Sequence, residues 1–91
     1  MPNIELHGYV DGEAQNLRKA IFELFKDEQF VGEMVVTIVN SQVRDAKGRS
    51  QPFIRVASTR ATYIRKLLKK LKTLGEDIEH LKLEAFYPKS G

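Results

Sequence analysis

Residues 34–58 read MVVTIVNSQVRDAKGRSQPFIRVAS, and this stretch decides how the chain folds. Two of its segments, 34–43 and 53–58, are rich in β-branched residues, which is typical of strands. The residues between them, 44–51, are polar and include a glycine, as expected of a turn. This connection is longer than the roughly two to five residues of a typical hairpin loop. It therefore favours strands that pair with other partners over a direct hairpin.

Two further segments carry apolar residues at helical spacing. One spans residues 12–28, with Asp11 as the expected N-cap, and the other begins after a cap at Ser58 or Thr59 and ends at Gly75. The expected buried stripes are Leu17, Ala20, Ile21, Leu24 and Phe25 in the first helix, and Ala61, Ile64, Leu67, Leu68, Leu71 and Leu74 in the second. Alternation predicts a strand over residues 3–9, and a last strand runs over 78–87 until Pro88.

The element order is therefore βαββαβ, in a single domain over residues 1–91. Because each helix has one apolar stripe, we expect an α+β, two-layer fold with both helices on one face of a four-stranded sheet. Two architectures share this order. In a ferredoxin-like sandwich the second and third strands form an antiparallel pair, whereas in the other arrangement each half is a parallel βαβ unit. The long polar connection favours the parallel arrangement, and the ferredoxin-like sandwich stays open as the alternative.

Composition limits the environment and the partners of the chain. With 91 residues, 42% hydrophobic and 30% charged, it is typical of a small globular domain with a thin core. The strand at 34–43 is apolar on both faces, so we expect a second copy of the chain to cover the open face of the sheet. There is no cysteine and only two histidines, far apart, so we expect no metal and no cofactor. No apolar stretch has membrane-spanning length and no leader pattern is present, so we expect a cytoplasmic protein without a membrane partner.

Met1-Pro2 at the start of the first strand, the repeated βαβ plan and the run at 36–53 resemble the tautomerase superfamily. The branches it most resembles are macrophage migration inhibitory factor and 5-carboxymethyl-2-hydroxymuconate isomerase. The resemblance implies a trimer with sites between subunits. It also implies a cofactor-free isomerase in which the mature N-terminal proline, here Pro2, moves a proton between carbon and oxygen of a small enol or 2-oxo acid. The family's cation near the start of the second strand is absent, because Glu33 occupies that region.

Candidate site residues follow from this chemistry. Removal of Met1 would leave Pro2 as a secondary amine, and an α-amino group has an ordinary pKa of about 8. A carboxylate substrate needs a cationic partner. Arg60 is the first candidate, because it follows the third strand at the start of the second helix, which we expect at the sheet end that carries Pro2. Arg44 and Arg55 are weaker candidates. The structural alternative is that Pro2 merely begins a strand and that the arginines are solvated.

The second helix carries a run of cations, and this run supports a different class of function. It contains Arg60, Arg65, Lys66, Lys69, Lys70 and Lys72, with no acid before Leu74. A basic helix face can bind an anionic partner, which makes a non-catalytic binding or assembly module the alternative to an isomerase. The net charge is only +3, and the clustered aromatics of single-strand binders are missing, so we do not expect nucleic acid as the partner.

Overall fold

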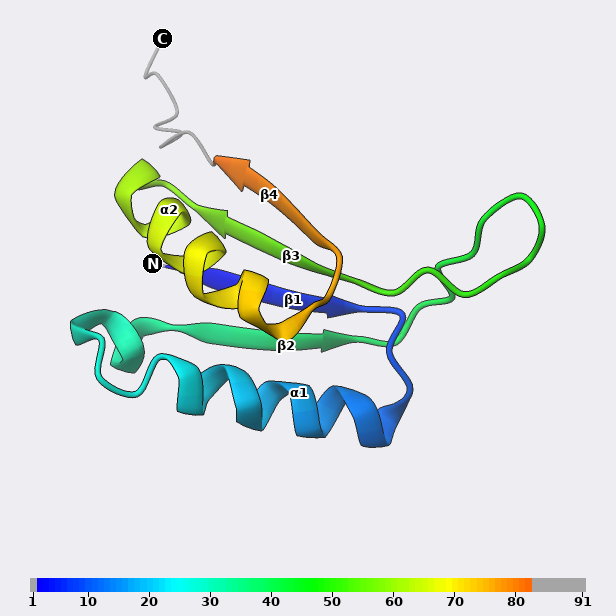
Figure 1. Cartoon of the computed structure of the whole chain (residues 1–91), viewed down its shortest axis with the longest axis horizontal. Coiled ribbons are helices and arrows are strands. Elements are labelled where there is room, and N and C mark those ends of the chain that lie inside the picture. Colours follow the sequence, from blue (N-terminus) through cyan, green and yellow to red (C-terminus); the bar gives the residue numbers. More distant parts are fainter. Residues whose placement is uncertain (1, 83–91) are drawn as a thin grey trace, which may run out of the picture.

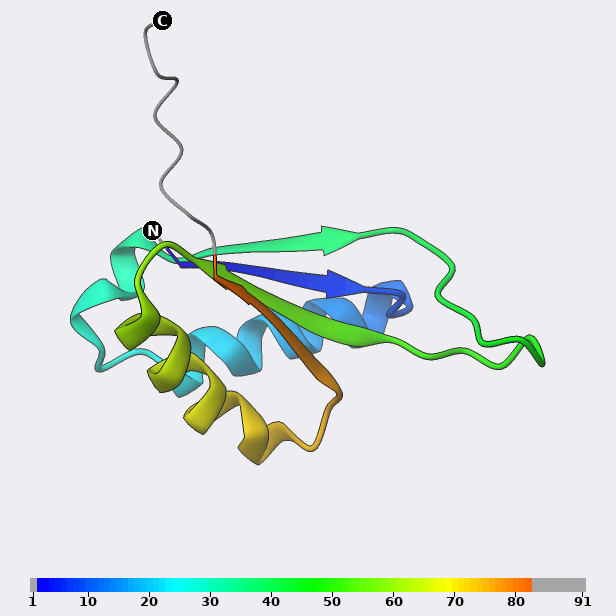
Figure 2. The same cartoon turned by 90° about the horizontal axis from the view of Figure 1, so that it is seen from above.

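The computed structural model describes residues 2–82 and shows one four-stranded sheet with both helices on the same face (Figures 1 and 2). In chain order the elements are β1 (Asn3–His7), α1 (Asp11–Leu24), the 3-10 helix η1 (Gln29–Glu33), β2 (Val35–Val39), β3 (Phe53–Ser58), α2 (Ala61–Leu71), the 3-10 helix η2 (Lys72–Leu74) and β4 (Ile78–Lys82). None of the helices in this part of the chain is long and apolar enough to span a bilayer.

Strand pairing decides between the two architectures. The strand order is β2-β1-β3-β4, with β1 parallel to β2, β3 parallel to β4, and the two central strands antiparallel. The ferredoxin-like alternative is wrong, because it requires β2 and β3 to be neighbours. The predicted α+β fold with parallel βαβ halves is confirmed. Within the sheet the two halves meet through β1 and β3, so the fold has an approximate internal two-fold symmetry.

Several predicted strand and helix limits were too long. Gly8 takes a φ of +81°, which turns the chain out of the sheet, so β1 ends at His7 rather than at residue 9. Because His7 pairs with Val39, β2 then loses its partner and ends there instead of at residue 43. Helix α1 stops at Leu24 rather than at residue 28. The last predicted strand is described only to residue 82, and its predicted remainder lies outside the described residues.

The helix caps also differ from the prediction. Val10 is the N-cap of α1, and Asp11 lies in its first turn without capping it. Arg60 is the N-cap of α2, while the Ser58 hydroxyl accepts a hydrogen bond from the Arg60 backbone N–H at 3.1 Å. Gly75 follows η2 with a φ of +74°, so the predicted glycine stop is confirmed.

The core lies between the sheet and the two helices. Its buried members include Ile4, Leu6, Ile54 and Val56 from the central strands, Ala14, Ile21 and Phe25 from α1 and its end, Phe30 from η1, and Leu67 and Leu71 from α2. Two predicted core residues, Ala20 and Ala61, are exposed. Ala20 is one residue from Ile21 and therefore lies on the flank of the buried stripe, and Ala61 begins α2 before that helix reaches the core.

Residues 43–51 form an arm that projects from the body of the molecule (Figure 1). Arg44 and Ser50 form an antiparallel bridge, and the Gln51 N–H donates to the Val43 carbonyl at 2.8 Å. The Asp45 carboxylate accepts from the backbone N–H groups of Lys47 and Arg49, and from the side chains of Arg49 and Gln51. The polar connection is thus a narrow hairpin of its own that does not pair β2 with β3.

Candidate functional site

Pro2 lies directly before β1 and is fully buried. The alternation of the strand places it with Ile4 and Leu6 on the face that the helices cover. Its carbonyl accepts a hydrogen bond from the Val35 N–H at 3.1 Å, which extends the parallel pairing of β1 and β2 by one residue. The first candidate residue is therefore held in the sheet by its backbone and in the core by its ring.

Ser58 lies opposite Pro2 in the neighbouring strand. Asn3 pairs with Ala57 across the antiparallel β1–β3 ladder, so the next position outward brings Pro2 and Ser58 side by side on the helix-covered face. Ser58 has no exposed surface, and it is the buried polar residue among those whose side chains the structure describes. From the sequence, Ser58 was predicted only as one of two candidate helix caps, because its burial depends on the register between the two strands.

Arg60 lies at the same end of the sheet, as expected from the sequence. It is exposed, and its guanidinium carbon sits 5.3 Å from the centre of the Tyr63 ring, with Nη1 3.4 Å from the Tyr63 hydroxyl. The Tyr63 ring packs in turn on Phe30, with 5.0 Å between the ring centres. A cation is thus fixed against a supported aromatic ring close to the strand that faces Pro2. No carboxylate of residues 2–79 forms a salt bridge with it.

Arg55 lies in a polar cluster on the opposite, open face of the sheet. Its guanidinium contacts Glu79 at 3.3 Å and Glu5 at 3.8 Å, and lies over the Phe53 ring at 5.5 Å. His7 joins the cluster, because its Nε2 is 2.7 Å from a Glu5 oxygen. Two carboxylates therefore compensate the Arg55 charge, and within one chain Arg55 and Pro2 lie on opposite faces of the sheet.

The cluster on the open face was not predicted. His7 pairs with Phe53 across the strands, and their rings stack at 4.8 Å with an interplanar angle of 1°. Glu5 pairs with Arg55 in the same way, and Arg55 pairs with Glu79. These contacts join residues that are distant in sequence, so only the strand register brings them together. The Nε atom of Arg55 is buried and has no hydrogen-bond partner among the described residues.

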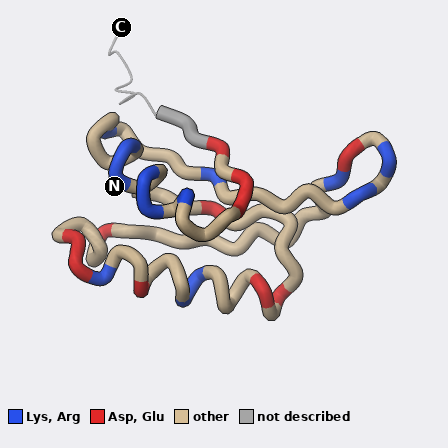
Figure 3. The backbone as a smooth tube through the Cα atoms, viewed as in Figure 1, with Lys and Arg blue, Asp and Glu red and all other residues tan. Residues whose placement is uncertain are grey.

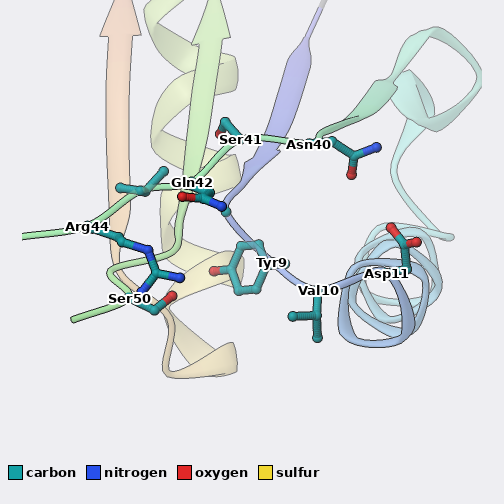
Figure 4. Close-up of a pocket in the computed structure, with 10 residues that line it drawn as sticks. Tyr9, Val10, Asp11, Asn40, Ser41, Gln42, Arg44 and Ser50 are labelled. Atoms are coloured by element: carbon teal, nitrogen blue, oxygen red, sulfur yellow. The ribbon is translucent and has the colours of Figure 1, made fainter. Parts of the chain in front are cut away.

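Arg44 lies at the other end of the sheet from Pro2, beside a cavity of about 510 Å³ (Figure 4). Tyr9, Arg44 and Ser50 lie on one side of this cavity, and Asp11 and Asn40 lie on the other. Its lining of amide, hydroxyl, guanidinium and carboxylate groups suits a polar ligand.

Two contacts fix the side of the cavity formed by Tyr9 and Arg44. Arg44 donates to the Gly48 carbonyl at 2.8 Å, and the Tyr9 hydroxyl donates to Glu76 at 2.9 Å. Burial and this hydrogen bond to Glu76 raise the pKa of the Tyr9 phenol well above its ordinary value. Tyr9 therefore acts there as a neutral hydrogen-bonding group.

Lys and Arg recur along α2, as the blue segments of Figure 3 show, and two of these cations form ion pairs within the fold. Lys70 lies 2.9 Å and Lys66 3.9 Å from the Glu28 carboxylate, which follows α1. The hydrogen bond from Lys70 lowers the pKa of Glu28 below its ordinary value. These two lysines hold α2 to the end of α1, while Arg65 and Lys69 are exposed. Within the described residues, no group of three or more His, Asp or Glu side chains could hold a metal ion.

Comparison with known proteins supports the fold alone. No known family model and no curated protein matches the chain. A solved structure of a protein of unknown function from Vibrio cholerae aligns with a TM-score of 0.64 and 12% identity, over 97% of this chain and 84% of that one. A macrophage migration inhibitory factor homologue from Prochlorococcus marinus aligns with a TM-score of 0.46 and 15% identity, over 92% of this chain and 89% of that one. Both similarities are too distant in sequence to support a conclusion about activity.

Proposed function

We propose that the protein is a cofactor-free tautomerase that acts on a small enol or 2-oxo acid. In this proposal Pro2 is the general base once Met1 has been removed, and Arg60 binds the substrate carboxylate. The observation that carries it is the antiparallel β1–β3 register, which brings the start of β1 and the segment that follows β3 to one end of the sheet.

The chemistry needs a base close to neutral pKa and a partner for negative charge. The free Pro2 amine takes a proton from the carbon next to the carbonyl, and the carbonyl oxygen becomes the enol oxygen when it receives a proton. The reverse transfer returns the proton to carbon. Burial of an amine disfavours its charged form and lowers its pKa, and the side chain of Pro2, whose ring carries this nitrogen, is fully buried. Arg60 contributes binding through bidentate hydrogen bonds to the carboxylate.

Assembly into a homo-oligomer, most simply a trimer, belongs to the same proposal. It is supported by the open face of the sheet, where Val35 is 41% exposed and the polar cluster of Glu5, Arg55 and Glu79 is uncovered in a single chain. A second copy that covers this face would bring Arg55, and from the far sheet end Arg44, into a shared site. Sedimentation at micromolar concentration tests this. A species close to the chain mass of 10.4 kDa would contradict the assembly and the site between subunits.

Keto–enol exchange of phenylpyruvate tests the catalytic proposal, with protein whose intact mass shows that Met1 is absent. Pro2→Ala keeps a primary amine but loses the ring, so the rate should fall by about 10²-fold. Arg60→Ala should raise KM more than it lowers kcat, because the carboxylate is bound in both ground and transition states. Arg65→Ala on the exposed side of α2 is the matched control and should change neither. Equal rates for the parent and Pro2→Ala would leave the proline with a structural role only.

The competing function is a binding module that uses α2. The exposed cations Arg65 and Lys69 favour it, while the pairing of Lys66 and Lys70 with Glu28 weighs against it. We expect weak binding to DNA or RNA at physiological salt. Submicromolar binding that is lost in the Lys66→Glu/Lys70→Glu protein would replace the isomerase proposal with this one.

A further inference from the structure

We infer that Tyr63 is a positioning residue for Arg60, with its ring and its hydroxyl holding the Arg60 guanidinium in place to bind a carboxylate. The inference rests on the proposed function, because it concerns the surroundings of the proposed carboxylate ligand. It goes beyond that proposal by naming the side chain on which the position of the guanidinium depends.

The backbone of Arg60 is fixed by its neighbours. As the N-cap of α2, Arg60 accepts at its carbonyl from the N–H groups of Tyr63 and Ile64, at 3.1 and 3.2 Å. Its own N–H donates to the Ser58 hydroxyl at 3.1 Å. The side chain of Arg60 is exposed, however, and a long arginine side chain has a large rotamer entropy when nothing holds it. The location of the guanidinium therefore depends on what that side chain contacts.

Tyr63 makes two contacts with this guanidinium. The guanidinium carbon of Arg60 lies over the Tyr63 ring, 5.3 Å from its centre, which is within the range of a cation–π interaction. In addition, Arg60 Nη1 donates a long hydrogen bond of 3.4 Å to the Tyr63 hydroxyl. Because both contacts act on one planar group, they restrict its position and its orientation together.

The Tyr63 ring is itself held by the core. It packs on Phe30 with 5.0 Å between the ring centres, and Phe30 packs on Phe25 with 6.0 Å between theirs. Phe25 is fully buried and Phe30 is 4% exposed, so these two rings cannot move away without opening a close-packed core. The three rings therefore connect the core of the protein to an exposed cation.

The held guanidinium keeps the donors that a carboxylate needs. Arginine has five N–H donors, and the Tyr63 hydroxyl takes one of them. Bidentate binding of a carboxylate takes two more. Because the side chain is already placed, it loses less rotamer freedom when the carboxylate binds, and binding is correspondingly tighter. Removal of the Tyr63 ring should therefore weaken carboxylate binding through Arg60.

The first test measures the mobility of Arg60 itself, by ¹⁵N relaxation of its Nε–H group in protein without substrate. In the parent, the Nε order parameter of Arg60 should be higher than that of Arg65, an exposed arginine on the same helix. Tyr63→Leu should lower it to the Arg65 value, whereas Tyr63→Phe, which keeps the ring, should retain most of the restriction. If Tyr63→Leu does not fold, Tyr63→Met replaces the ring by a flexible apolar chain and should give the same result.

The second test is a double-mutant cycle on the binding of phenylpyruvate to protein free of Met1. Tyr63→Leu should raise the dissociation constant about two- to five-fold, as expected from the loss of an exposed cation–π contact. The same substitution in Arg60→Ala protein should cause no further rise, because the group that it positions is gone. Thr62→Ala, at the exposed neighbouring position of α2, is the control and should leave the dissociation constant unchanged.

The outcomes separate this inference from the proposed function. An Arg60 order parameter that is unchanged in Tyr63→Leu, or in Tyr63→Met where leucine does not fold, overturns the positioning role. A dissociation constant that does not rise in Tyr63→Leu, or that rises equally without Arg60, overturns it too. If catalysis nevertheless depends on Pro2 and Arg60, the proposed function stands without it. If the mobility of Arg60 changes as expected but phenylpyruvate neither binds nor exchanges, the positioning is real and the proposed function fails.

Discussion

Gly8→Ala tests the close packing at the end of β1. Gly8 has a φ of +81°, and a Cβ built there would lie 3.1 Å from Val43 Cγ2 and 3.4 Å from the Pro52 backbone. Two costs therefore add. The left-handed backbone costs a residue with a side chain about 1 kcal/mol, and crowding a packed site costs about 1–3 kcal/mol more. We expect Gly8→Ala to lower the free energy of unfolding by about 2–4 kcal/mol.

Gly75→Ala is the matched control for Gly8→Ala. Gly75 has a similar φ of +74°, but no atom lies within 4 Å of the position that a Cβ would take there. Only the backbone cost of about 1 kcal/mol therefore applies. Urea unfolding of the two variants at unchanged m-value measures the difference. If Gly8→Ala is no less stable than Gly75→Ala, the turn after β1 does not pack against the base of the arm as described, and the reasoning about where β1 and β2 end is wrong.

Three further predictions concern ionisable groups. Backbone and side-chain hydrogen bonds from Arg49 lower the pKa of Asp45. The Lys47 amide, which donates to Asp45, should therefore be protected from exchange above the ordinary aspartate pKa of about 4, and this protection should fall as pH drops through the lowered pKa. Asp45→Ala should abolish the protection. Because the folded-state pKa of Tyr9 is raised, stability should decline as pH rises past about 10, where the unfolded chain releases this proton, and Tyr9→Phe should remove that part of the decline in thermal melts. Glu28→Gln should lower the urea midpoint at pH 7, because Lys70 loses its charged partner. The difference in midpoint between the parent and Glu28→Gln should disappear in acid, once pH falls below the lowered pKa of Glu28. An equal difference in midpoint at both pH values would contradict the ion pair.

Local patterns in the sequence predicted most of the fold. The apolar stripes around Ile21 and Leu67 predicted the two helices, and the long polar connection after the second strand predicted parallel halves. The ends of the strands were harder to predict from the sequence, because β2 ends where β1 turns away at Gly8. That limit depends on a partner strand and not on the residues of β2 themselves.

The candidate site was predictable only where chain order determines position. Arg60 follows β3, whose end meets the start of β1, so its place near Pro2 follows from the topology. The same topology places Arg44 at the far end, because β2 runs parallel to β1 and ends away from Pro2. Ser58 and the open-face cluster around Arg55 required the strand register, which local sequence does not reveal.

The most direct test of the central proposal compares two forms of the same chain, one beginning at Pro2 and one in which Met1 is retained, each verified by intact mass. Exchange of the carbon-bound protons of phenylpyruvate in D₂O, followed by ¹H NMR, reports the proton transfer at carbon. The account predicts rapid exchange by the form that begins at Pro2, and a rate at least about 10²-fold lower when Met1 turns the proline nitrogen into an amide without basicity. Equal exchange by the two forms would contradict Pro2 as the base.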